Sequence, residues 1–132
     1  MEIINIGYHS IGLQLQTLHE RKVQKGNKMD KWDKRFMDLA EEIAHWTSCY
    51  KTDRSIGAII VKNKRIVTTG YNGAPAGIDS CKDRGECLRI NMGIPSGERH
   101  ELCYAIHAEQ NAIIQAAKLG VAIDGATMYC TH

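Results

Sequence analysis

A short triplet, His107-Ala108-Glu109, carries the residue types best suited to catalysis in this chain of 132 residues. Histidine binds metal ions and exchanges protons near neutral pH, and glutamate is a common general acid or base. Alone, such a pair is usually a helix cap and a surface charge. Its context favours a functional site, because a long loop connects it to a glycine-rich turn, Gly70-Tyr71-Asn72-Gly73.

Cysteines form the second set of residues that could do chemistry, and they are Cys49, Cys81, Cys87, Cys103 and Cys130. Their number is odd and no secretion signal is visible, so we do not expect a disulfide framework. Cysteines in a reducing compartment are free thiols or metal ligands, and both interpretations stay open here. We expect a cytoplasmic protein.

The composition is that of an ordinary globular domain. A hydrophobic content of 43% and a charged content of 24% exclude a disordered chain and a low-complexity scaffold. The length suits one domain with a real core. No apolar run approaches the length of a membrane span, so no membrane partner is expected. A net charge of +2 disfavours a nucleic-acid partner.

Hydrophobic spacing predicts the elements that must position these residues. Apolar side chains recur at helical spacing over residues 31–48, after Asp30 as N-cap. Two β-branched runs, 56–61 and 65–70, flank a short polar turn and predict a hairpin. A second helix should begin near Ile106 and stop at Gly120, and a third strand should cover 127–131. Residues 71–104 are rich in turn formers and read as a long loop.

The first 28 residues differ from the rest of the chain. Ile11, Leu13 and Leu15 alternate with polar residues or glycine, which weakly indicates a strand, and a basic stretch follows it. Met29 could be the true initiator, which would make these residues a leader or an artefact. A genuine N-terminal extension is the other interpretation. The domain itself should span residues 29–132.

Three segments together resemble a known family. The sequences TTGYNGAPAG (68–77), AIHAEQNAIIQAAKLG (105–120) and GATMYCTH (125–132) resemble the zinc-dependent cytidine/deoxycytidylate deaminase family, and among its members the deoxycytidylate deaminases. The resemblance covers roughly residues 30–132. It implies an α/β fold, the three-layer α/β/α sandwich of cytidine deaminases, of which this chain supplies a helix, a β-hairpin, a helix and a strand.

The resemblance implies zinc-dependent hydrolytic deamination of dCMP to dUMP with release of ammonia. It gives His107 the role of a catalytic zinc ligand, and Glu109 that of the proton carrier. Zinc supplies a nucleophile at neutral pH because it lowers the pKa of its bound water to about 7. The Ala108 amide would face the base carbonyl and Asn72 would hold the nucleoside. Asn72 is also a natural turn residue beside Gly73, and both interpretations can be true.

The chain departs from the family pattern at its last residues. In the family, two further zinc ligands come from a Pro-Cys-x-x-Cys segment after the third strand, and no such segment occurs before His132. We therefore expect a C-terminally incomplete domain that is inactive as given, with the strand at 127–131 left as an unpaired edge. Cys130 is expected to be a packed thiol, and His132 is not expected to reach the metal.

The other four cysteines resemble a structural zinc site found in some deoxycytidylate deaminases. Cys49, Cys81, Cys87 and Cys103 would staple the long loop, with His100 as an alternative fourth ligand. Since no pair has the compact Cys-x-x-Cys spacing, separate thiols remain an alternative. The arginines of this loop, Arg84, Arg89 and Arg99, are either phosphate contacts or part of a solvated face.

Two other functions stay open. One is deamination of a tRNA adenosine or another nucleobase, although such an enzyme should carry a basic stripe. The other is a non-catalytic module stapled by zinc. For an intact family member the resemblance implies a small deoxynucleotide as substrate and a homo-oligomer as the assembly.

Overall fold

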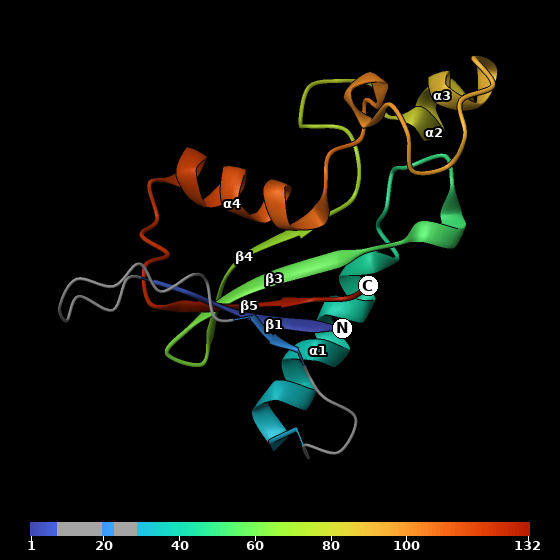
Figure 1. The fold of residues 1–132 in the computed structure, drawn as a ribbon. Helices are drawn as coiled ribbons and strands as arrows, with labels where there is room; N and C mark the ends of the chain where they lie inside the picture. Colours follow the sequence, from blue (N-terminus) through green and yellow to red (C-terminus); the bar gives the residue numbers. More distant parts are fainter. Residues whose placement is uncertain (8–19, 23–28) are drawn as a thin grey trace, which may run out of the picture.

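A five-stranded sheet with a helix on each face forms the body of the molecule (Figure 1). The computed structural model describes residues 1–7, 20–22 and 29–132. The strands lie in the order β2-β1-β5-β3-β4, and every neighbouring pair is antiparallel. Their bounds are β1 Glu2–Ile6, β2 Glu20–Lys22, β3 Gly57–Lys62, β4 Arg65–Tyr71 and β5 Ala126–Cys130.

The first helix, α1, spans Lys31–Ala44 and begins as predicted, because Asp30 accepts hydrogen bonds from the Trp32 and Asp33 amides at 2.6 and 2.8 Å. The prediction that it continues to residue 48 is wrong. Tight turns follow Ala44, and the Thr47 hydroxyl donates to the Asn72 carbonyl at 2.8 Å. That bond draws the chain toward the end of β4.

Within the described ranges, no helix is long and apolar enough to cross a membrane.

The predicted hairpin is confirmed as β3 and β4. Its two-residue turn, Asn63-Lys64, has positive φ at both positions, 52° and 59°. Two positive φ values give the turn a backbone twist that matches two paired strands. The hairpin ends at Tyr71, so the first two residues of the glycine-rich turn, Gly70 and Tyr71, are the last two of β4.

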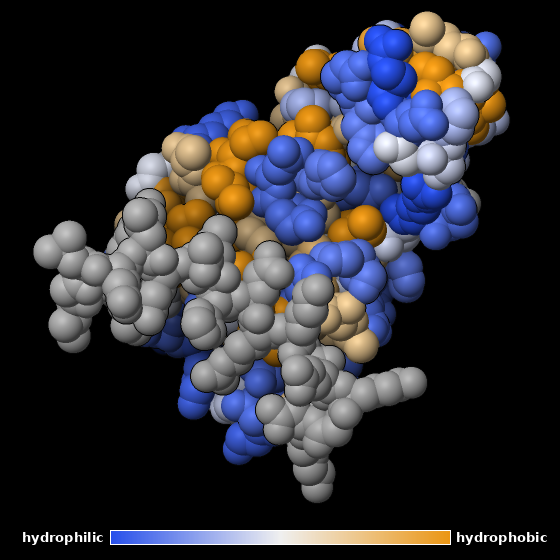
Figure 2. Space-filling view, in the orientation of Figure 1, coloured by the Kyte–Doolittle hydropathy of each residue, from blue (hydrophilic) through white to orange (hydrophobic). Residues whose placement is uncertain are grey.

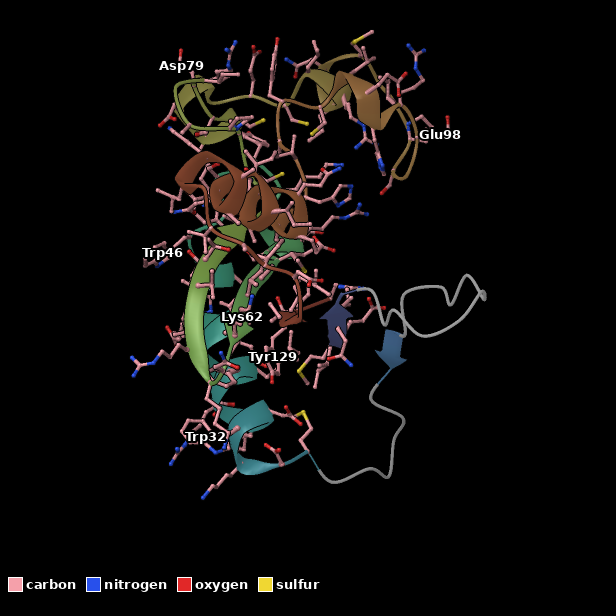
Figure 3. The ribbon with its side chains drawn as sticks, turned by 90° about the vertical axis from the view of Figure 1, so that its left-hand side faces the viewer. Trp32, Trp46, Lys62, Asp79, Glu98 and Tyr129 are labelled. Atoms are coloured by element: carbon pink, nitrogen blue, oxygen red, sulfur yellow. The ribbon has the colours of Figure 1, made fainter. Side chains whose placement is uncertain are left out.

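The sheet separates two apolar layers of different character. On the α1 side the buried residues are large and include Phe36, Met37, Ile59 and Tyr129. On the other side α4 (Ala108–Leu119) packs with Ala108, Ala112 and Ala116. Side chains alternate along β3, with Ile59 facing α1 and Ala58 facing α4. Figure 3 shows Tyr129 between the sheet and α1.

Small contact residues bring α4 very close to the sheet. A Cβ built on Gly70 of β4 would overlap the Ala108 carbonyl oxygen and lie 2.5 Å from the Ala112 nitrogen. The helix can therefore cross β4 only where the strand has no side chain. Its outer face carries exposed apolar residues, among them Ile113 and Ile114. Figure 2 shows hydrophobic atoms, in orange, on the surface in the region of α4. The helix ends as predicted at Gly120, which has φ 68°.

The edge of β5 is paired, so the expectation of an open edge at 127–131 is wrong. β1 runs antiparallel to β5 over its whole length, from Glu2 opposite Cys130 to Ile6 opposite Ala126. The physical reason is that Ile4 and Ile6 of β1 pack onto the apolar layer beneath α4. The strand suggested by Ile11, Leu13 and Leu15 lies outside the described residues.

Residues 72–107 form a long excursion, as predicted, and contain short helices that the sequence did not predict. These are α2 (Cys81–Arg84), α3 (Leu88–Asn91) and η2 (His100–Leu102), while η1 (Thr52–Arg54) precedes β3. Ser80 and Asp83 cap α2 reciprocally. Figure 3 shows this segment, marked by Asp79 and Glu98, beyond α4 and far from Trp32.

Candidate active site

The first turn of α4 presents the His107 and Glu109 side chains. His107 is the N-cap residue and is exposed, and its backbone amide donates to Gln110 Oε1 at 3.2 Å. Ala108 is fully buried, and its amide is one of the first four of the helix, which lack intrahelical acceptors. The turn therefore offers an imidazole, a carboxylate and free helix amides to one location. The helix dipole favours negative charge there.

Glu109 has an unusual environment for a carboxylate. Its Oε2 atom is buried and has no hydrogen-bond partner among the described residues. A buried polar atom without a partner costs about 1–3 kcal/mol. Such an atom suits a group whose partner arrives with a ligand, such as a water molecule or a substrate amine.

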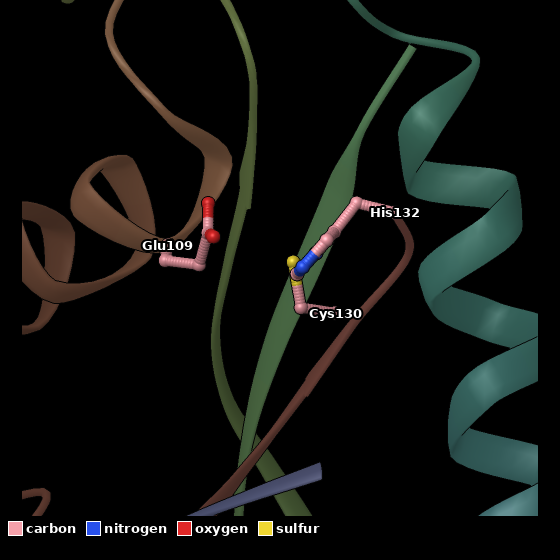
Figure 4. A group of neighbouring side chains, drawn as sticks. All are labelled: Glu109, Cys130 and His132. Carbon is pink, nitrogen blue, oxygen red and sulfur yellow. The ribbon is translucent and has the colours of Figure 1, made fainter. Parts of the chain in front are cut away.

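Glu109 faces two residues across the sheet end, Cys130 at the end of β5 and His132 just beyond it, as Figure 4 shows. One potential ligand atom from each of Glu109, Cys130 and His132 lies within 4.8 Å of the others, and no second group this compact occurs among the described residues. His132 was not expected to reach this location, and the structure brings it there. Its Nε2 also lies 3.2 Å from a carboxylate oxygen of Glu2 on β1.

Cys130 is a fully buried thiol, as the sequence predicted. Burial raises the pKa of Cys130 from 9.0 to about 12, and the nearby negative charge of Glu109 adds to the effect. The thiol is therefore neutral at physiological pH. It fills the layer beneath α4 directly below the Glu109 carboxylate.

The Asn72 side chain is engaged with the protein backbone. Its Oδ1 accepts from the Ile56 amide at 2.9 Å, and its Nδ2 donates to the Arg54 carbonyl at 2.6 Å. The turn is held from another side as well, because a Cβ on Gly73 would collide with Ser48. Asn72 thus lies in a rigid turn beside α4, and its role toward a ligand stays a prediction.

Asn111 lies in the segment that resembles the family, but the sequence did not predict a role for it. Its Nδ2 donates to the carbonyl oxygens of Tyr71 and Gly73, at 2.8 and 3.3 Å. The available signal was its residue type, because asparagine is a poor helix former inside an alanine-rich helix. Its contacts link α4 to the glycine-rich turn.

Three of the four cysteines of the predicted set lie in the excursion between β4 and α4, and the fourth, Cys49, lies between α1 and β3. Cys81 and Cys87 are buried, Cys49 and Cys103 are half-buried, and all four are free thiols. Burial raises the pKa of Cys81, and the neighbouring Cys103, Cys49 and Cys87 raise it further. Among the described residues they do not form a group as tight as that at Glu109, so the sulfurs would have to move inward to share a metal. His100 is exposed.

The loop arginines have different environments. Arg89 is only 8% exposed and donates to the Pro95 carbonyl at 3.2 Å, so it is part of the loop interior. Arg84 lies over the Tyr104 ring at 4.4 Å. Arg99 pairs with Glu101 on the surface. The Nε atom of Arg89 is buried and has no hydrogen-bond partner among the described residues.

Comparison with known proteins settles the family. Residues 30–132 match the family described as the cytidine and deoxycytidylate deaminase zinc-binding region. The chain belongs to this family. The exposed imidazole of His107 suits a first ligand to the family's zinc, and the unpartnered Glu109 oxygen suits a carboxylate that serves what the metal holds.

Curated relatives from this deaminase family cover most of the chain. The deoxycytidylate deaminase of Schizosaccharomyces pombe is 36% identical over 99 residues, which are 75% of this chain and 30% of that protein. ComE operon protein 2 of Bacillus subtilis is 41% identical over 101 residues, 76% of this chain and 48% of that protein. The chain thus spans about a third of the first of these relatives and about half of the second.

Solved structures in the deaminase family share the fold. The dCMP deaminase of the cyanophage S-TIM5 in complex with dCMP and dUMP is 30% identical and gives a TM-score of 0.60. The match covers 80% of this chain and 68% of that chain. The expected cytidine deaminase-like α/β fold is therefore confirmed, with a helix on each face of the sheet.

Proposed function

We propose that this protein deaminates dCMP hydrolytically, giving dUMP and ammonia. The observation that carries the proposal is the Glu109 carboxylate, whose buried Oε2 lacks a partner beside the exposed imidazole of His107. The names of the relatives support the substrate, because those from Schizosaccharomyces pombe and Mycobacterium phage D29 are deoxycytidylate deaminases. The solved structure with dCMP and dUMP supports it as well.

Each residue of the first turn of α4 has a defined part in this chemistry. His107 would hold the zinc, which supplies a water molecule of lowered pKa when bound. Glu109 would accept a proton from that water and would deliver protons to the ring nitrogen and to the departing amine. In the overall reaction the oxygen of water replaces the exocyclic amine on the ring carbon, and the amine leaves as ammonia. The Ala108 amide would face the base carbonyl, and Asn72 would hold the nucleoside.

The test is ammonia release from dCMP by a purified version that carries the family's Pro-Cys-x-x-Cys ligands as well as His107, in the presence of zinc, compared with its Glu109→Gln variant. Residues 1–132 alone supply one of the three family ligands and are expected to be inactive. Glutamine keeps the size of the side chain but cannot carry a proton, so we expect kcat to fall by about 10²–10⁴. Glu98→Gln, an exposed substitution in the excursion, is the matched control and should leave kcat unchanged. Undiminished turnover in Glu109→Gln would overturn the assignment.

The alternative substrates are tested in the same assay. A tRNA adenosine would require a basic binding surface, and the net charge of +2 gives little support for one. We expect turnover of dCMP to exceed that of a tRNA anticodon stem. The reverse order would favour the tRNA enzyme, and zinc binding without turnover of either would favour a non-catalytic module.

We also propose that Cys49, Cys81, Cys87 and Cys103 hold a structural zinc. One support is that the other three cysteines all raise the pKa of Cys81. A second is that three of the four lie in one excursion with little regular structure of its own, while Cys49 follows α1. A thiolate-bound zinc would close this excursion against the end of α1.

The domain, its location and its assembly complete the proposal. We propose that residues 29–132 form the deaminase domain and that β1 of the N-terminal extension adds to its sheet. Five free thiols support a cytoplasmic location. Exposed apolar residues of α4, among them Ile113 and Ile114, support a homo-oligomer, which light scattering of the purified protein would test.

A further inference from the structure

Asn111 joins the two halves of the candidate site through one side chain. Its Nδ2 carries two hydrogens and meets two acceptors, the carbonyl oxygens of Tyr71 at 2.8 Å and Gly73 at 3.3 Å. These two carbonyls flank Asn72 on either side. The side-chain amide therefore holds the backbone of the turn immediately before and immediately after the Asn72 residue.

The backbone of Asn111 is tied to the other half of the site. Its amide donates to the His107 carbonyl at 3.0 Å, the first hydrogen bond of α4. The residue thus contacts the N-cap through its main chain and the glycine-rich turn through its side chain. Any rotation of the first helical turn changes the distance to both carbonyls of the turn.

A second connection runs beside the first one. Gly73 and Ile106 exchange backbone hydrogen bonds of 3.2 and 3.0 Å, just before His107. The Gly73 carbonyl oxygen accepts hydrogen bonds from the Ile106 amide and from the Asn111 side chain. The Tyr71 carbonyl oxygen accepts one from Asn111 and none from Ile106. Removing the Asn111 amide would leave the Tyr71 side of the turn without this anchor and would weaken the Gly73 side.

We propose that Asn111 is a positioning residue that sets the Asn72 turn against the first turn of α4. The inference rests on the proposed function. It states that substrate binding depends on the distance between Asn72 and the Ala108 amide. Asn111 itself touches neither the substrate nor the reacting atoms. Loss of the Asn111 side chain should weaken dCMP binding. It should affect proton transfer by Glu109 less, because Glu109 is positioned by α4 itself.

The sharpest test is Asn111→Asp, which keeps the shape of the side chain and places carboxylate oxygens against two carbonyl oxygens. We expect KM for dCMP to rise about tenfold or more, with kcat within about threefold of the wild type. Asn111→Gln keeps the amide donor and should recover part of the KM. Asn91→Ala, at an exposed asparagine that donates to Glu86 at 2.7 Å, is the control and should leave KM unchanged.

Amide hydrogen exchange gives a readout that does not require turnover. The Gly73 and Ile106 amides should exchange faster in Asn111→Asp than in the wild type and in Asn91→Ala. Unchanged exchange at both amides would overturn the inference, and so would a lower Tm with unchanged KM and unchanged exchange. If the wild type has no activity on dCMP, the proposed function fails, and the exchange rates alone decide the role of Asn111.

Discussion

Gly70 lies directly against the backbone of Ala108, at the point where α4 crosses β4. Because Ala108 stands between His107 and Glu109, this crossing fixes the height of the whole first turn above the sheet. The absence of one side chain on the strand therefore positions the residues proposed to carry out the reaction.

Replacing Gly70 with alanine should destabilise the fold and displace the site. The new methyl group would overlap the Ala108 carbonyl oxygen, and neither the helix nor the strand can yield without breaking backbone contacts. We expect a loss of about 1–3 kcal/mol in the free energy of unfolding, measured by urea denaturation. Ile66→Val, at an exposed position of the same strand, should have little effect. Equal stability of the two variants would contradict the close approach.

Removing the His107 imidazole should remove the catalytic zinc. We expect His107→Ala to lose one equivalent of zinc and all turnover, because the other proposed residues of this turn do not replace an imidazole ligand. Glu109→Gln should keep the same zinc content as the wild type while losing turnover, since the carboxylate is assigned to proton transfer. Metal analysis after dialysis separates the two roles. Full zinc content in His107→Ala would show that the ligand lies elsewhere.

The cysteine set predicts a separate response to chelation, best measured in the His107→Ala background, where only the structural metal remains. A chelator should lower the Tm there by about 5 °C or more, because the excursion loses its closure. Cys81→Ser and Cys87→Ser should each have a lower Tm and no further response to the chelator. Cys130→Ala, outside the set, should keep the response. A Tm that is insensitive to chelation before any cysteine is changed would remove the structural zinc.

Alkaline pH should reveal the buried thiol of Cys130. Its pKa is raised from 9.0 to about 12 in the folded protein, so the unfolded chain loses this proton at lower pH than the folded one. The contribution of this thiol to the free energy of unfolding is fully present well below pH 9. It is lost as the pH rises toward 12, by about 1 kcal/mol between pH 8 and 10. Cys130→Ala should show a shallower decline over this interval. Parallel pH profiles of unfolding free energy would refute the shift.

Local signals in the sequence predicted the elements that carry the site. Asp30 and Gly120 mark helix ends through their own hydrogen bonding and φ, and the turn at Asn63-Lys64 closes the hairpin within a few residues. His107 and Glu109 were found because their spacing belongs to a motif. In each case the physical cause lies within a few residues of its effect.

Long-range contacts account for what the sequence did not predict. The pairing of β1 with β5 joins Glu2 to Cys130, and no local pattern reports such a partner. The early end of α1 results from the bond between Thr47 and the Asn72 carbonyl, which requires β4 to be in place. The meeting of His132 with Glu109 depends on the register of β5 beneath α4. Each of these three contacts forms only when the sheet has folded.

The alanine face of α4 limits which substitutions this sequence can accept. The same constraint recurs on the other face, because Ala40 and Ala44 of α1 lie against Gly57 as closely as Ala108 and Ala112 lie against Gly70. Elsewhere in the α1 layer, long side chains such as Met37 and Phe36 can repack around one another. Substitutions should therefore accumulate among these large residues, while the two helix crossings accept only residues of the smallest size.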